Sequence, residues 1–151
     1  MHKEYLTPPL SEFRAQAHRI HAQLLASLRE LARAPQTQAF WALESALLAH
    51  LRAEEELLLP DFDLAYPSDA AQVRGEHQRI RELLMRVASG GHAQAPDARV
   101  IEALCACLNE CASVEEHALY PWAEQRLRAT KKGEFMQRAR ANAASSELLA
   151  S

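Results

Sequence analysis

Histidine and glutamate occur at a spacing of one helical turn in this sequence, a combination that can hold a metal ion. His50 is followed four residues later by Glu54. Residues at i and i+4 lie one above the other on a helix face, so both side chains can reach the same ion. Imidazole is a ligand for iron and zinc, and carboxylates bind hard cations. The pair by itself is weak evidence, because many helices carry it by chance.

The second half of the chain repeats this segment at a constant offset. Cys111 stands at the place of His50, and the other matches pair Glu54 with Glu115, Glu55 with Glu116, and Pro60 with Pro121. The repeat indicates two related helix pairs, each ending in a carboxylate and a proline. The repeat, together with the spacing, indicates that Glu54 and Glu115 are metal ligands.

One further histidine lies on the helix that precedes each of these segments. His18 and His77 each come six residues before a Leu-Leu pair, and we expect both to face inward. His21, one turn from His18 on nearly the same face, is the alternative for the first position. A buried carboxylate pair without a cation is costly, so this set predicts a metal cage.

The composition requires helices to position these residues. Ala and Leu number 29 and 22, against 4 Val, 3 Ile and 3 Thr, in 151 residues. Helices favour Ala and Leu, whereas strands favour β-branched residues. Apolar periodicity and proline positions predict helices over about 10–33, 36–59, 69–89 and 96–120, with Pro60 ending the second and Pro121 kinking the fourth. Asp61 to Pro67 is expected to be a connection.

The predicted fold is all-α: an antiparallel up-down-up-down four-helix bundle with a short C-terminal fifth helix over about 131–144. We expect one domain over 1–151, with the bundle core at about 10–128. The last residues, Ser145 to Ser151, are expected to fray.

The histidine and glutamate pattern, with the Leu-Tyr-Pro that ends at Pro121, resembles the hemerythrin-like (HHE cation-binding) family over about 10–144. The resemblance implies a four-helix bundle around a non-haem, oxo-bridged di-iron centre that binds or senses dioxygen. It implies that His18 and His50 are ligands of one iron and His77 a ligand of the other. Glu54 and Glu115 would be the bridging carboxylates.

Two positions depart from the family pattern. Cys111 stands where the family usually has a histidine, and it can be a small core residue, a thiolate ligand or a redox thiol. Arg81 stands where hemerythrin proper has a second histidine, and it can neutralise Glu115 in place of a metal. The predicted metal ligands are therefore His18, His50, Glu54, His77, Cys111 and Glu115.

Other classes are disfavoured by what the sequence lacks. The net charge of -3 argues against nucleic-acid binding, and no apolar stretch is long enough for a membrane span. The three clustered cysteines make a poor disulfide framework, and no signal peptide is evident, so we expect reduced thiols and a cytoplasmic location. No E-x-x-H, H-E-x-x-H or G-x-S-x-G motif occurs.

These observations predict a protein that binds one or two non-haem iron ions, with zinc or manganese as alternatives, and that binds or senses dioxygen, another small oxidant or redox state. Catalysis is not the favoured role. Two other functions stay open: a degenerate helical scaffold with no metal or one metal, and a small di-metal oxidase or peroxidase.

Overall fold

The computed structural model describes residues 12–89 and 96–150, and its regular elements there are all helices. They are α1 (Glu12–Arg33), α2 (Thr37–Leu57), α3 (Leu59–Ala65), α4 (Pro67–Ala88), α5 (Ala98–Val114), the π-helical segment η1 (Glu115–Leu119), α6 (Tyr120–Arg126) and α7 (Ala129–Ala150). The predicted all-α class is confirmed.

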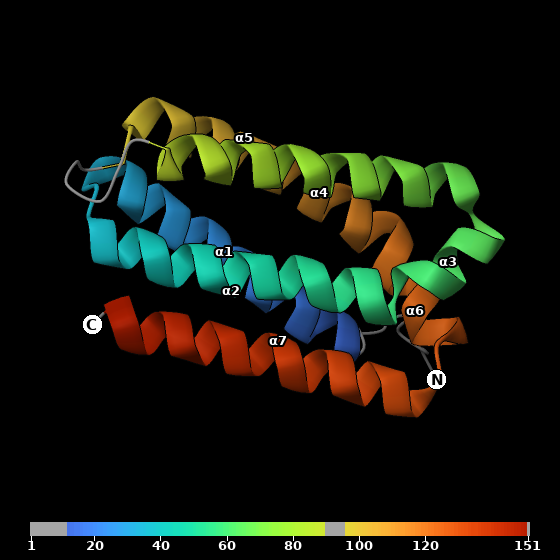
Figure 1. Cartoon of the computed structure of the whole chain (residues 1–151). Helices are drawn as coiled ribbons and strands as arrows, with labels where there is room; N and C mark the ends of the chain where they lie inside the picture. The colour runs from blue at the N-terminus through green and yellow to red at the C-terminus, as the bar shows by residue number, and fades with distance from the viewer. Residues whose placement is uncertain (1–11, 90–95, 151) are drawn as a thin grey trace, which may run out of the picture.

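The long helices lie side by side along one axis, with α3 and α6 at one end (Figure 1). Helix α5 packs against α1 and α4, and α2 packs against α7. Each long helix directs an apolar stripe inward, so the core runs the length of the molecule. Its largest fully buried side chains include Tyr120, Phe62, Phe135, Leu28, Leu47, Leu51, Ile80, Ile101, Leu104 and Leu108.

The two repeated prolines act differently from one another. Before Pro60, α2 ends at Leu57, two residues short of the expected end, and Leu58 interrupts the helix with φ −106° and ψ −48°. The expected connection from Asp61 to Pro67 is wrong, because α3 occupies 59–65 with Pro60 in its first turn. Proline is tolerated there since first-turn N–H groups have no helical partner.

Before Pro121 the helix widens instead of breaking. The N–H of Tyr120 bonds to the carbonyl of Glu115, five residues earlier, which closes a π-helical turn. Proline lacks an N–H and crowds the carbonyl four residues before it, and a wider turn relieves that conflict. Helix α6 then starts at Tyr120. The π-helical turn therefore begins at Glu115, one of the predicted ligands.

The C-terminal helix is longer than the predicted 131–144. It spans Ala129–Ala150 and packs along α2 and α1. Its Phe135, Met136 and Ala139 are buried, so α7 closes one side of the core. The predicted fraying of the tail is also wrong up to Ala150, because the helix continues to that residue.

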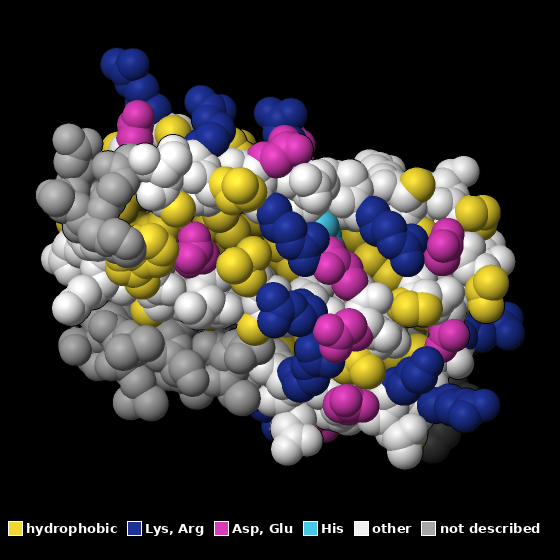
Figure 2. All heavy atoms as spheres, in the orientation of Figure 1, with side chains coloured by type: hydrophobic (Ala, Val, Ile, Leu, Met, Phe, Trp, Pro, Cys, Tyr) yellow, Lys and Arg dark blue, Asp and Glu magenta, His cyan; other side chains and the backbone are white. Residues whose placement is uncertain are grey.

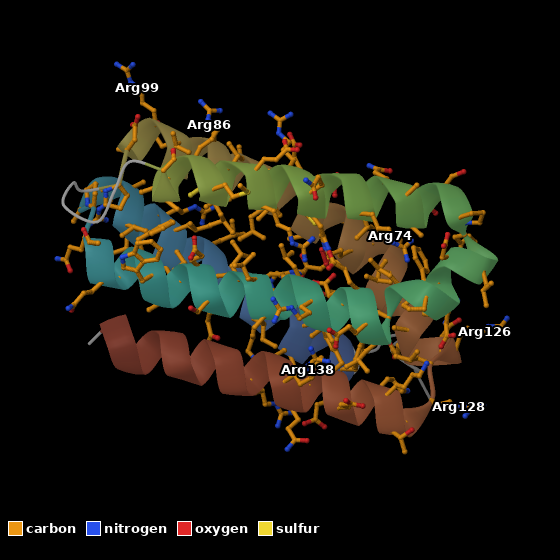
Figure 3. All side chains as sticks on the ribbon, in the orientation of Figure 1. Arg74, Arg86, Arg99, Arg126, Arg128 and Arg138 are labelled. Atoms are coloured by element: carbon orange, nitrogen blue, oxygen red, sulfur yellow. The ribbon has the colours of Figure 1, made fainter. Side chains whose placement is uncertain are left out.

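The surface carries charges of both signs. Figure 2 shows Lys and Arg side chains alternating with Asp and Glu over the face that α4, α2 and α7 share. Arg74 lies 3.4 Å from Asp63, and Arg138 lies 2.9 Å from Glu56. Figure 3 shows Arg86 and Arg99 pointing away from the helices. Within the described ranges, no helix is both long enough and apolar enough to cross a membrane.

Candidate metal centre

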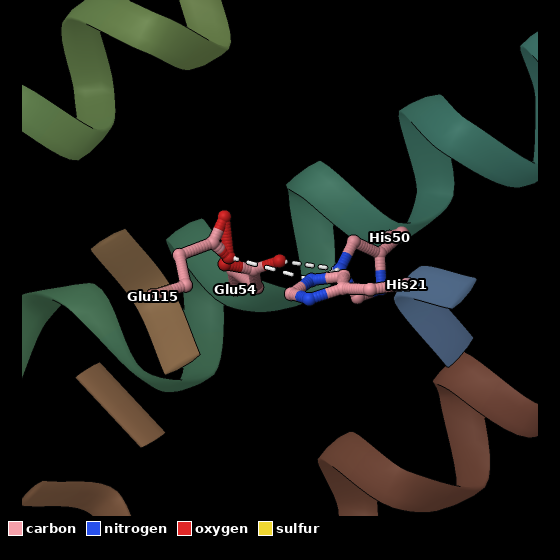
Figure 4. Close-up of side chains that lie close together, drawn as sticks. All are labelled: His21, His50, Glu54 and Glu115. Atoms are coloured by element: carbon pink, nitrogen blue, oxygen red, sulfur yellow. Dashed lines mark hydrogen bonds and ion pairs between the residues drawn. The ribbon is translucent and has the colours of Figure 1, made fainter. Parts of the chain in front are cut away.

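Four buried side chains from three separate segments meet in the middle of the helices. His21 comes from α1, His50 and Glu54 from α2, and Glu115 from η1. One ligand atom of each lies within 4.8 Å of those of the others (Figure 4). None of these side chains is more than 2% exposed. Two imidazoles and two carboxylates at this separation can bind one metal ion.

The contacts inside this group are short. Nε2 of His50 lies 2.5 Å from Oε1 of Glu54 and 3.2 Å from Nε2 of His21. Nε2 of His21 lies 3.8 Å from Oε2 of Glu115. The ring nitrogens of both histidines therefore point toward the two carboxylates, the orientation that ligation requires.

A second group adjoins the first and shares Glu115 with it. His77, Cys111 and Glu115 also offer ligand atoms that all lie within 4.8 Å of one another. Nε2 of His77 lies 3.5 Å from Oε1 of Glu115 and 3.8 Å from Oε2 of Glu54. The Cys111 thiol donates to Oε1 of Glu115 over 2.8 Å. Glu54 and Glu115 thus lie between two groups of potential ligands.

The structure brings five of the six predicted residues together: His50, Glu54, His77, Cys111 and Glu115. His18 is the exception and requires a correction. Its side chain is 62% exposed and forms an ion pair with Glu116, while His21 takes the inward position. His21 lies four residues after Ala17 and three before Leu24, both buried, so it belongs to the apolar stripe of α1. The spacing of the apolar residues along α1 was therefore the feature of the sequence that could have predicted the inward position of His21.

The expectation that Arg81 neutralises Glu115 is wrong, because Arg81 pairs with Glu55. Its guanidinium binds Glu55 through two nitrogens, at 2.7 and 2.6 Å. Glu55 in turn accepts from Nδ1 of His77 at 2.8 Å. These contacts orient the His77 ring and leave its Nε2 directed at the carboxylates.

Tyr120 is a site residue that the sequence reasoning missed. Its hydroxyl lies 2.9 Å from Nε2 of His21, and it donates toward Glu54 at 3.3 Å and Glu115 at 3.4 Å. The π-helical turn places it there, five residues after Glu115. The available signal in the sequence was a tyrosine directly before Pro121. The repeat does not support it, because the matching residue before Pro60 is Leu59.

Burial controls the charges of the metal-free site. Burial and the neighbouring Glu115 raise the pKa of Glu54. Burial also acts to raise the pKa of Glu115, but the neighbouring Glu54 and His77 side chains outweigh it and lower that pKa. The pair therefore retains one proton, on Glu54, because two adjacent buried carboxylates cannot both ionise without a cation.

The pKa values of His50 and His77 shift in opposite directions. Burial and the nearby His21 lower the pKa of His50 to about 3, so its ring is neutral. Burial acts to lower the pKa of His77, but the neighbouring carboxylates of Glu115 and Glu55 raise it to about 9. A proton on His77 therefore supplies positive charge beside Glu115 when no metal does.

Several polar atoms of the site lack a hydrogen-bond partner among the described residues. They include Nε2 of His77, Oε2 of Glu54 and Nδ1 of His21. Buried polar atoms are almost always paired, so such atoms call for an explanation. A cation between the two carboxylates would satisfy Nε2 of His77 and Oε2 of Glu54, and it would replace the proton on Glu54. The residues present therefore fit a metal ion.

One comparison with known proteins identifies the family. The model of the hemerythrin HHE cation binding domain matches residues 10–95. The chain belongs to the hemerythrin family. The matched range contains His21, His50, Glu54 and His77, whereas Cys111, Glu115 and Tyr120 lie beyond it. No match was found among curated proteins or among solved structures.

Proposed function

We propose that this hemerythrin-family protein holds one or two non-haem iron ions and uses them to bind or sense dioxygen, another small oxidant or redox state. The observation that supports it best is the buried group of His21, His50, Glu54 and Glu115, whose ligand atoms lie within 4.8 Å of one another. Bound iron would supply one-electron and dioxygen chemistry. Zinc or manganese would find the same donors.

The protein's own residues have separable roles in this proposal. His21, His50 and His77 are the imidazole ligands, and Glu54 and Glu115 are the carboxylates that lie between the two groups. Glu55 and Arg81 orient His77, and the hydrophobic side chains around the site exclude water. Cys111 completes the second group as a thiolate if a second ion binds.

The stoichiometry follows from the donors. The first group offers four ligand residues, and the second offers three, one of them a thiol and one shared. Burial and the nearby carboxylates of Glu115 and Glu54 raise the pKa of Cys111. The thiol therefore stays protonated unless a bound metal ion displaces the proton. We therefore propose that the first group fills before the second.

The proposal also covers the topology of the helices around the site, the location of the protein and its partners. We infer that α1, α2, α4 and α5 form an antiparallel up-down-up-down bundle, which Figure 1 supports because consecutive long helices are joined at alternating ends. We propose a cytoplasmic location and no nucleic-acid or membrane partner. The mixed charges of the face in Figure 2 support the absence of a nucleic-acid partner.

The experiment combines metal analysis with removal of one central carboxylate. Protein expressed with added iron is analysed for metal per chain and for near-ultraviolet absorption, in wild type and in Glu54→Gln and Glu54→Ala. We expect iron in wild type, and loss of iron together with a lower Tm in both variants, because metal that binds only the folded state adds to stability.

Glu56→Ala is the matched control. Glu56 lies two residues further along α2, its side chain is 53% exposed, and it contacts Arg138. Its replacement should cost within about 0.5 kcal/mol and leave iron unchanged. Wild-type protein without any metal, or full iron loading in a folded Glu54→Gln protein, would contradict the proposal.

A further inference from the structure

The candidate metal centre is enclosed, so an ion needs a route to it. His21 is 2% exposed, Glu54 0% and Glu115 1%. A surface pocket of about 260 Å³ lies beside it, lined by Arg14, His18, Glu116, His117 and Tyr120. Two of these lining residues, Glu116 and Tyr120, also contact His21. A single layer of side chains therefore separates the pocket from the site.

Glu116 connects the exposed histidine with the buried one. Its Oε1 binds Nδ1 of His18, and its Oε2 lies 3.9 Å from Nδ1 of His21. That nitrogen of His21 is buried and has no hydrogen-bond partner among the residues described. One oxygen of the Glu116 carboxylate therefore faces the exposed imidazole of His18, and the other faces the buried imidazole of His21.

The pocket has the chemistry of a weak cation site. An imidazole and a carboxylate are ligands for first-row divalent metals. His18 and Glu116 supply one of each, and the two side chains form an ion pair at the pocket. The one guanidinium in the lining, that of Arg14, lies 3.9 Å from Glu124, so its charge is partly offset.

Two other surface pockets lack this connection. One of about 400 Å³ is lined by Glu30, Leu31 and Leu43 among others, and its lining includes no residue of the metal centre. Another, of about 520 Å³, lies between α1 and α7, is lined by Phe13 and Met136 among others, and likewise excludes the site residues.

We propose that the pocket lined by His18, Glu116 and Tyr120 is the entry site through which divalent metal ions reach the centre. The ion first binds the exposed His18 and Glu116. It then passes to His21 as the Glu116 carboxylate and the Tyr120 hydroxyl turn aside. His18 is therefore a ligand during loading and not in the final centre. This inference rests on the proposed metal-binding function.

The test is the rate of Co²⁺ uptake by metal-free protein, followed by the visible absorption of bound Co²⁺. Three proteins are compared: wild type, His18→Ala, which removes the first ligand, and His18→Trp, which also fills the pocket. We expect uptake and release in both variants to slow by the same factor, about tenfold, which is within what a charged cleft adds to association rates. Stoichiometry and Kd stay unchanged, because an entry site alters rates and not the final state.

Glu30→Ala and Glu30→Trp are the matched controls. Glu30 is also an exposed residue of α1 that lines a pocket, and its carboxylate is a possible metal ligand, but the lining of that pocket includes no residue of the site. Both controls should take up Co²⁺ at the wild-type rate. Equal unfolding temperatures of the metal-free proteins verify that the His18 variants are folded.

Each other outcome overturns a different statement. Wild-type rates in both His18 variants, or slowing in the Glu30 controls to the same extent, would overturn the entry site while leaving the metal centre. A Kd weakened more than tenfold in His18→Ala would make His18 a permanent ligand and would overturn it too. No Co²⁺ uptake by wild type would overturn the proposed function, and the entry site with it.

Discussion

At the scale of single residues, the candidate centre depends on which histidine of α1 faces inward. His18 and His21 are one turn apart, yet one is 62% exposed on its side chain and the other 2%. The difference comes from the apolar stripe of α1, which includes His21 and excludes His18. A family pattern that counts one histidine per helix does not distinguish them, whereas burial does.

His21→Ala should therefore abolish tight metal binding by the first group. The variant loses one of four ligands, and Nε2 of His50 loses a partner at 3.2 Å. The measurement is metal per chain after dialysis against dilute metal, with Gln23→Ala as a control at an exposed position of the same helix. Full loading of His21→Ala together with loss of metal from His18→Ala would restore His18 as the ligand.

Cys111 decides how many ions the site holds. It occupies the place of His50 in the repeat and is fully buried beside Glu115. Thiolate is a softer ligand than imidazole, so Cys111→His should raise the iron content of the second group. The comparison is iron per chain in wild type and Cys111→His prepared identically. Two irons per chain in both would mean that Cys111 already completes the second group.

At the scale of elements, α7 is part of the support of the site. The Phe135 ring is buried, and its centroid lies 6.1 Å from the ring centroids of both His50 and Tyr120. It also packs against Phe13 of α1 at 6.0 Å. Helix α7 therefore holds two site residues in place, although it contributes no ligand.

Phe135→Ala should lower the free energy of unfolding by about 3 to 5 kcal/mol, because it removes a buried aromatic ring and leaves a cavity. It should also weaken metal retention, since the His50 and Tyr120 rings lose a packing partner. Denaturant unfolding of the metal-free protein measures the first effect. Glu134→Ala, at an exposed neighbouring position, should change stability by no more than about 0.5 kcal/mol. An equal loss in the two variants would show that α7 does not support the site.

At the scale of the whole molecule, the site joins segments that the sequence keeps far apart. His21, His50, His77 and Glu115 come from α1, α2, α4 and η1, so ions bound in the two groups would together link four parts of the fold. In the metal-free protein, protons on Glu54 and His77 offset the charge of the two carboxylates, but they do not link the helices as an ion would.

Removal of metal by a chelator should consequently lower the Tm of the wild-type protein. A ligand at 100 times its Kd adds about 2.7 kcal/mol to stability. For a domain of this size that corresponds to a shift of about 5 to 10 °C. Thermal unfolding with and without added metal measures the shift, which should disappear in Glu54→Gln. An unchanged Tm on metal addition would indicate that no ion bridges these helices.

The sequence by itself determined the helical class, since Ala and Leu dominate and β-branched residues are scarce. It also determined most of the candidate site, because one-turn spacing places His50 with Glu54, and the repeat adds Cys111 and Glu115. These are local relations, and helix geometry makes local relations readable from spacing.

The tertiary structure decided the relations between helices. It selected His21 over His18, paired Arg81 with Glu55 and not with Glu115, and brought Tyr120 into the site through a π-helical turn. It also extended α7 along α2. Each of these depends on which side chains meet across helices, and the spacing within one helix carries no information about the rotation and register of its neighbours.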